Sequence, residues 1–435
     1  MILRMRKRKL QMLRLLKNNN LFSLEGMVCF FMCFFVAFVV FPLKFLVFSS
    51  NIYYSGEFSP FSSHYLYAAD VCFLFGLLFC GLNFAFSRDL KFNLKNIEFD
   101  RNLLFLSSFF VIFTSISLFF SVNIDNSLFS LLRLFEFFVL YLLLVFEIVS
   151  FKPLIFTFLG AMFLSSLIGI FQFILQHSIG VKLLGESVIS NSMAGVAKLD
   201  IFDFKILRAY GTFSHPNVFS GFLIIALIFV YIFHRDGAFS RKFVNIFALF
   251  VLFSAFILTF SKATLVAFLF LVFFIYWRNF SKKLKIFLFG LIGLLLVLLL
   301  LSQVTILERV RFLAISEKLF WSHPFGVGIG NFTESMSQFS YYKLFPWNYQ
   351  PVHNVFLLVL NEVGFPGFML FLLIFTYGIY ESLKYRRHII FALFFVLMVI
   401  SLFDHYLFSL YQGQFLFWFI MAYVTCSHSG RLKHP

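Results

Sequence analysis

The segment from Arg208 to Asn217 combines residue types that bind an anion. It reads Arg-Ala-Tyr-Gly-Thr-Phe-Ser-His-Pro-Asn and contains His215 and Pro216. Proline suits the first turn of a helix, and the first amides of a helix have no partner within it, so donors and positive charge converge there. We predict a diphosphate site in which Arg208 and His215 are ligands and Asn217 supports them. The alternative is an interface arginine beside an ordinary helix start.

Lys262 and His353 could complete such a site. Lys262 ends the polar break Leu-Thr-Phe-Ser-Lys between two apolar stretches, where an ammonium needs water or an anion. His353 follows a long polar segment and carries the side chain that titrates near neutral pH, so we predict that it is a general base. Asn354 and Glu362 are predicted to support it. Interface lysine and helix-cap histidine are the alternatives.

The polar segment before His353 holds a glycine pattern and two arginines. Residues 323–331 read His-Pro-Phe-Gly-Val-Gly-Ile-Gly-Asn, and three alternate glycines resemble a phosphate loop. Such a pattern is weak evidence without a strand before it and a helix after it, so we predict a close-packed turn. Of Arg309 and Arg311, Arg311 is predicted to support the anion site.

Four other polar residues in or beside apolar stretches are predicted to be structural. Arg133 and Glu136 are three residues apart, so on a helix they share a face and can neutralise each other. Asp404 and His405 lie between two apolar stretches, where a membrane-interface role is the simpler interpretation.

The sequence shows no recognisable metal-binding pattern. The five cysteines lie in or beside apolar stretches without the spacing of a zinc site or a disulfide framework. The closest outward carboxylates, Asp200 and Asp203, make an unconvincing magnesium or manganese site. We therefore expect no metal and no cofactor.

The composition predicts the elements that must position these residues. Of 435 residues, 61% are hydrophobic and 12% are charged, and the mean hydropathy is +0.94. The apolar residues form blocks of about 20, the length with which a helix crosses a hydrocarbon layer. We predict an all-α polytopic membrane protein with about 12 transmembrane helices. The predicted spans are 27–46, 65–87, 102–121, 127–149, 153–176, 216–233, 244–260, 263–277, 284–302, 353–376, 388–403 and 406–426.

The basic residues predict the orientation of these spans. The net charge is +16, and most of the 35 Lys and Arg residues fall in the N-terminal segment and in connections on one side of the membrane. This asymmetry satisfies the positive-inside rule and removes the main support for nucleic-acid binding. Both termini are then cytoplasmic, and two long loops face outward. The predicted divisions are a basic N-terminus (1–26), helices with the first outer loop 177–215 (27–302), the large outer loop (303–352), three helices (353–426) and a tail (427–435).

Taken in order, these motifs resemble the O-antigen ligase and polymerase superfamily of bacterial envelope enzymes. The resemblance covers about residues 127 to 426, and it rests on the segments 208–217, 258–262, 323–332 and 353–364. It implies a GT-C-like, metal-independent, inverting glycosyltransferase on the outer face of the bacterial cytoplasmic membrane. The implied donor is a glycan on undecaprenyl diphosphate, and the implied acceptor is a glycan, a lipid or a protein.

The resemblance also implies roles for individual residues. Arg208 would bind the donor diphosphate, and His353 would activate the acceptor hydroxyl. Lys262 departs from the family, which usually has arginine there, and lysine lacks the bidentate fork for phosphate. An O-antigen ligase is the leading hypothesis; a repeat-unit polymerase, a protein O-oligosaccharyltransferase and, in a different class, a transporter or flippase of lipid-linked solutes are the alternatives.

Overall fold

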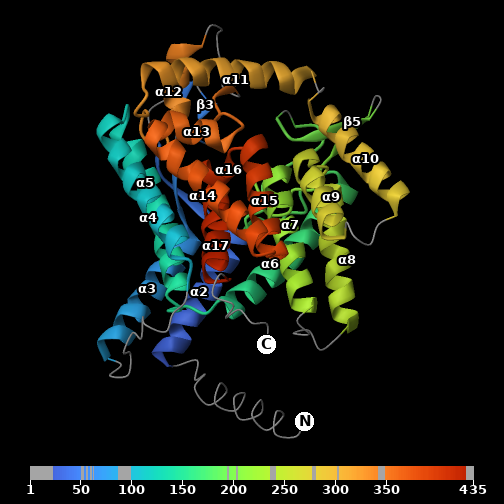
Figure 1. Ribbon diagram of the computed structural model, residues 1–435, viewed down its shortest axis with the longest axis horizontal. Helices are drawn as coiled ribbons and strands as arrows, with labels where there is room; N and C mark the ends of the chain where they lie inside the picture. Colours follow the sequence, from blue (N-terminus) through green and yellow to red (C-terminus); the bar gives the residue numbers. More distant parts are fainter. Residues whose placement is uncertain are drawn as a thin grey trace, which may run out of the picture.

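The protein is mostly helical in its computed structural model (Figure 1). The structure describes residues 23–49, 53–54, 57–58, 61, 63–86, 99–193, 195–201, 204–235, 242–276, 281–300, 303–340 and 348–427. Most of the predicted N-terminal segment, Asp203 and the tail beyond residue 427 lie outside these ranges. The α-helices are α2 (Leu24–Val40), α3 (Ala68–Phe86), α4 (Arg101–Ile116), α5 (Ile124–Val145), α6 (Phe151–Leu175), α7 (Pro216–Arg235), α8 (Lys242–Leu258), α9 (Lys262–Tyr276), α10 (Lys282–Leu300), α11 (Gln303–Ser322), α12 (Phe332–Phe339), α13 (Val355–Glu362), α14 (Gly364–Lys384), α15 (His388–Phe403), α16 (Tyr406–Ser409) and α17 (Tyr411–Ser427).

Six of the described helical segments are long and apolar enough to cross a membrane, as expected of a polytopic membrane protein. Four shorter apolar helices accompany them, and the count of about 12 spans stays a prediction. The six long segments are Ala68–Phe86, Arg101–Phe120, Ile124–Val145, Phe151–Leu175, Pro216–Arg235 and Gly364–Lys384.

Helices α7 and α17 form the centre of the bundle. In α17 every residue from Tyr411 to Cys426 is buried, and α7 is buried along most of its length. Helix α17 packs against α5, α2 and α16, whereas α7 packs against α8, α6 and α15. A helix enclosed on all sides needs apolar residues around its whole circumference, and both sequences meet that requirement.

Three small antiparallel sheets modify the all-α prediction. The predicted first span, 27–46, is helical only as far as Val40, because Pro42 cannot continue the hydrogen-bonded pattern of a helix. The apolar run after it is rich in residues that favour strands, and it forms β1, which pairs with β4. The strands are β1 (Lys44–Ser49), β2 (Tyr53–Tyr54), β3 (Glu57–Phe58), β4 (Ser63–Tyr67), β5 (Lys198–Ile201) and β6 (Phe204–Leu207), and the other pairs are β2–β3 and β5–β6.

The predicted outer loop 303–352 and the span after it also differ from the prediction. Much of the loop is helical, because it contains α11 and α12, and α11 lies across one end of the bundle (Figure 1). The predicted helix 353–376 is two helices, α13 and α14, that meet at Gly364. Its φ of +85° is in the left-handed region, and a side chain at Gly364 would meet the backbone of Phe325. The last predicted span is likewise divided, into α16 and α17.

Candidate active site

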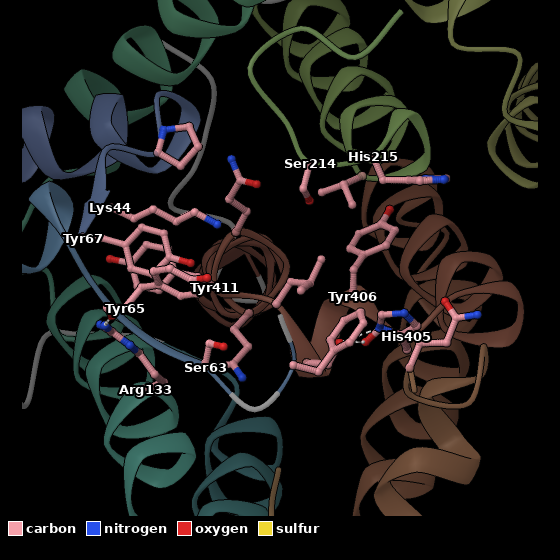
Figure 2. Close-up of a pocket in the computed structure, with 18 of the residues that line it drawn as sticks. Lys44, Ser63, Tyr65, Tyr67, Arg133, Ser214, His215, His405, Tyr406 and Tyr411 are labelled. Carbon is pink, nitrogen blue, oxygen red and sulfur yellow. Dashed lines mark hydrogen bonds between the residues drawn. The ribbon is translucent and has the colours of Figure 1, made fainter. Parts of the chain in front are cut away.

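A cavity of about 550 Å³ opens between the β1–β4 sheet, α5, the start of α7 and the turn between α15 and α16. Two groups of polar side chains face each other across it (Figure 2). We call the group formed by His215, Asn217, His353, Asp404 and His405 the histidine side. The opposite group, the arginine side, is formed by Lys44, Tyr65, Tyr67, Arg133 and Tyr411.

A chain of hydrogen bonds links Arg208 to the histidine side. The guanidinium Nε of Arg208 donates to the carbonyl of Thr259 at 2.6 Å, and its Nη2 donates to Oδ1 of Asn217 at 2.9 Å. The amide Nδ2 of Asn217 in turn donates to Oδ2 of Asp404 at 3.1 Å. Burial lowers the pKa of Arg208 to about 10, a change that Tyr210 and Asp404 oppose, so Arg208 stays a cation at neutral pH. Asn217 thus connects this cation to a carboxylate.

Two histidines of this side are neutral at neutral pH. Burial lowers the pKa of His215 to about 4 and that of His405 to about 3, although the charge of Asp404 opposes both changes. The backbone N–H of Asn217 donates to Nδ1 of His215 at 3.1 Å, so the proton of the neutral ring is on Nε2. Both imidazoles therefore have an unshared electron pair and an N–H group to offer a ligand or a neighbour.

His353 lies beside Asp404 and His405. The rings of His353 and His405 have centroids 5.2 Å apart, and one nitrogen of each ring and a carboxylate oxygen of Asp404 all lie within 4.8 Å of one another. Burial raises the pKa of Asp404, but the nearby His405, His353 and His215 and the hydrogen bond from Asn217 outweigh it, so the pKa falls. An ionised carboxylate therefore lies next to the ring of His353.

Arg309, and not Arg311, is the arginine of α11 that is coupled to this side. The guanidinium of Arg309 lies 5.7 Å from the ring centre of Phe403, next to Asp404. Burial lowers the pKa of Arg309, and the charge of Asp404 opposes this change. The side chain of Arg311 is exposed. Neither arginine lines the cavity, and helix periodicity alone did not say which of the two lies closer to Asp404.

Lys262 is the first residue of α9 and directly follows Thr259, Phe260 and Ser261 of the polar break. Thr259, whose carbonyl accepts from Arg208, lies in this break, and Phe260 has a φ of +48°, which is rare for a residue other than glycine. Lys262 does not line the cavity. Its predicted part in binding an anion stays a prediction.

Asn354 and Glu362 hold α13, the helix that begins just after His353. Oδ1 of Asn354 accepts from the N–H of Leu357 at 3.0 Å and caps the helix, while its Nδ2 donates to the carbonyl of Leu402 at 3.2 Å. Glu362, at the other end of α13, is buried away from the cavity lining. Neither residue lines the cavity, and their predicted support of His353 stays a prediction.

The glycines of the 323–331 segment form the close-packed turn that the sequence predicts. Gly326, Gly328 and Gly330 have φ of +88°, +88° and +84°. A side chain at Gly328 would meet Ser127, and one at Gly330 would meet Ser130, both on α5. The carboxylate of Glu362 accepts from the N–H of Gly330 at 2.8 Å, so the turn and α13 are tied together.

The arginine side contains the predicted pair of Arg133 with Glu136 and a partner that the sequence did not reveal. Nη1 of Arg133 lies 2.9 Å from Glu136 and 2.6 Å from Asp70 on α3, and Nη2 donates to the carbonyl of Tyr65. The hydroxyl of Tyr411 donates to Glu136 at 3.1 Å. This largely buried cation, with 14% of its side chain exposed, has two carboxylates within ion-pair distance.

Asp404, His405 and Tyr406 are candidate site residues that the sequence did not reveal; it predicted a membrane-interface role for Asp404 and His405 and no role for Tyr406. All three line the cavity. The hydroxyl of Tyr406 is buried and has no hydrogen-bond partner within the described part of the chain. The available signal was the adjacent acid and histidine, Asp404 and His405, at the end of an apolar stretch. Their proximity to His353 depends on how α13, α14 and α15 fold back on one another.

Comparison with known proteins gives one family match. Residues 247–372 match a family model described as O-antigen ligase. This range includes Lys262 and His353, whereas Arg208 and Asp404 lie outside it. No curated protein matches the chain. The family match supports a function of the ligase or polymerase type in a membrane-embedded protein, and it bears out the resemblance of the ordered motifs to the O-antigen ligase superfamily.

Proposed function

We propose that the protein transfers a glycan from an undecaprenyl-diphosphate donor to an acceptor hydroxyl on the outer face of the bacterial cytoplasmic membrane, in the manner of an O-antigen ligase. One observation carries the proposal: a base candidate, His353, and a carboxylate, Asp404, line one cavity beside apolar helices, and Asn217, which also lines it, links that carboxylate to the guanidinium of Arg208. The proposed orientation, with both termini in the cytoplasm, is supported by the distribution of the basic residues.

The first part of the proposed reaction is activation of the acceptor by His353. Its imidazole takes the hydroxyl proton while the acceptor oxygen forms a bond to the anomeric carbon of the donor sugar. The bond from that carbon to the diphosphate oxygen breaks in the same displacement, so the configuration at the anomeric carbon is inverted. Asp404, within 4.8 Å of His353, stabilises the imidazolium that forms.

The second part is stabilisation of the departing diphosphate. The leaving group gains negative charge as the bond breaks, and preorganised cations lower the energy of that state. Arg208 supplies one cation, Arg309 a second, and the N–H of neutral His215 a hydrogen-bond donor. One cation at about 4 Å contributes roughly 4 kcal/mol at an effective dielectric constant near 20, about a thousandfold in rate if realised only in the transition state.

Turnover by purified protein tests this proposal. The protein is supplied with undecaprenyl-diphosphate glycan and a panel of acceptors comprising lipid A core, the growing polysaccharide and a protein, and the new glycosidic bond is measured. Product on lipid A core is expected, and product on another acceptor would instead identify a polymerase or a protein O-oligosaccharyltransferase. Movement of the donor across liposomes without a new bond would replace the enzyme with a transporter.

Substitutions at Lys262 test its place in the diphosphate site. Lys262→Arg should keep or raise activity, because arginine retains the charge and adds a bidentate fork for phosphate. Lys262→Ala should lower activity. Equal activity of Lys262→Ala and the parent protein would assign this lysine to the membrane interface.

A further inference from the structure

The side chains of His353, Asp404 and His405 have the spacing of metal ligands. One donor atom of each lies within 4.8 Å of the other two. A tetrahedral Zn²⁺ with bonds of about 2.0 to 2.1 Å holds its donors about 3.4 Å apart, so binding would draw these atoms together by at most about 1.4 Å. The cavity they line leaves space for a water molecule or another ligand in the fourth position.

Two of the three ligand candidates are already oriented by second partners. Nδ1 of His405 lies 2.6 Å from the hydroxyl of Ser409, so its Nε2 is the nitrogen available to an ion. Oδ1 of Asp404 accepts from the backbone N–H of His405 at 2.8 Å, and Oδ2 accepts from Asn217 at 3.1 Å. Protein metal sites commonly fix their histidines and carboxylates by such outer hydrogen bonds.

We propose that His353, Asp404 and His405 form a binding site for Zn²⁺ and that the bound ion inhibits glycan transfer. Two imidazoles and one carboxylate match the N and O donor set of open zinc sites, whereas Mg²⁺ prefers oxygen donors alone. The bound ion takes the electron pair with which His353 would accept the acceptor proton. The binding stands on the geometry alone, and the inhibition rests on the proposed function.

Metal titration of the purified full chain without a polyhistidine tag tests the site. Competition with a fluorescent zinc chelator should show one Zn²⁺ per chain, and Mg²⁺ should not displace it. His405→Gln and Asp404→Asn should weaken binding at least tenfold, and Ser409→Ala should weaken it about tenfold through loss of the outer hydrogen bond. His177→Gln, which changes a histidine outside the cavity lining, is the matched control and should bind normally. Unchanged binding in both His405→Gln and Asp404→Asn would overturn the site.

Two further measurements are needed. The first shows metal binding without a variant that could fail to fold, and the second distinguishes zinc binding from inhibition of transfer. Co²⁺ replaces Zn²⁺ in the parent protein, and its visible absorption should show a four-coordinate N and O site; a six-coordinate aqueous spectrum would overturn the proposal without any variant. Added Zn²⁺ should abolish transfer and a chelator should restore it. Full activity with Zn²⁺ bound would overturn the proposed inhibition. Zinc binding by a protein that transfers no glycan under any condition would overturn the proposed function, but the proposed zinc site would stand.

Discussion

The two sides of the cavity both place an arginine near carboxylates, but they use its charge differently. On the arginine side, Arg133 lies within 3 Å of Asp70 and of Glu136, so its charge is neutralised by direct ion pairs. Near the histidine side, Arg208 donates to a carbonyl and to the neutral amide of Asn217, and it is this amide and not the guanidinium that donates to Asp404. Its positive charge is therefore still available to an anion.

The two sides also come from different kinds of element. Asp70, Arg133 and Glu136 are carried by the long helices α3 and α5, which are candidate membrane spans. His215, His353 and Asp404 lie just outside helices, in segments held by caps and turns. Buried ion pairs on spans join helices to one another, whereas polar groups at helix ends can face both the cavity and a substrate. We infer that the arginine side maintains the bundle and that the histidine side performs the chemistry.

Replacement of the base candidate should have the largest effect. His353→Ala should lower the rate of transfer by about 10² to 10⁴, the usual contribution of a general base, with donor binding largely retained. Initial rates and binding of labelled donor measure the two quantities, and His177→Ala is the control. An active His353→Ala protein would remove the base assignment and, with it, the division of roles between the two sides.

Replacement of the arginine-side cation should destabilise the protein. Arg133→Met leaves Asp70 and Glu136 as buried carboxylates without their cation, which costs about 3 to 5 kcal/mol of stability. Thermal unfolding in detergent measures the loss, and addition of Asp70→Asn and Glu136→Gln to the same protein should restore part of it.

The same substitution at Arg208 tests whether the two arginines have different roles. Arg208→Met should weaken donor binding and transfer but change thermal stability less than Arg133→Met does, because no carboxylate in direct contact loses its partner. Equal destabilisation by the two substitutions would mean that Arg208 is structural as well.

Replacement of Asp404 tests whether its carboxylate assists His353. Asp404→Asn removes the negative charge within 4.8 Å of His353, and an interaction of roughly 3 kcal/mol at an effective dielectric constant near 20 corresponds to roughly a hundredfold slower transfer. The turnover number should fall while the KM for the donor changes little. An unchanged turnover number would separate Asp404 from the proton transfer.

The sequence predicted those features of the two sides that depend on residues close together in the chain. Hydropathy located most of the apolar helices but not α11 and α12, the helix period placed Arg133 beside Glu136, and the glycines marked a close-packed turn. The sequence did not reveal contacts between distant segments. Asp70 reaches Arg133 from another helix, and Asp404 reaches His353 only because α13 to α15 fold back together.

Two local errors had identifiable physical causes. The run after Pro42 is as apolar as a membrane span, so hydropathy alone could not separate strand β1 from helix α2, although the proline marked the break. Gly364 marked the division between α13 and α14 in the same way, but a glycine within an apolar helix is often tolerated. In both places the deciding information was backbone conformation.

The histidine side should make stability depend on pH. His215 and His405 have pKa values of about 4 and about 3 in the folded protein, below the value of about 6.5 for an unfolded histidine. Below pH 6.5 or so the unfolded state therefore binds protons that the folded state does not, so stability is full above this pH and falls as the pH is lowered. From pH 6.5 to pH 5, each histidine should cost about 2 kcal/mol.

Unfolding temperatures at these pH values check this prediction. The lowered pKa of Asp404 acts only below the unfolded aspartate value of about 3.9, so it does not contribute in this range. His405→Gln should remove about half of the decrease. A decrease of the same size in the variant would mean that other groups cause it.

The smallest expected effect concerns the position of His353 and not its chemistry. Asn354→Ala removes the cap of α13 and the bond to Leu402, which should cost about 1 kcal/mol of stability and lower transfer modestly, because the helix start next to His353 loses an anchor. Asn354→Asp keeps the capping oxygen and loses only the donor to Leu402, so its stability should lie between those of the parent and the alanine variant. If Asn354→Ala slowed transfer as much as His353→Ala while leaving stability unchanged, Asn354 would contact the substrate, and the histidine side would extend beyond the cavity residues that define it.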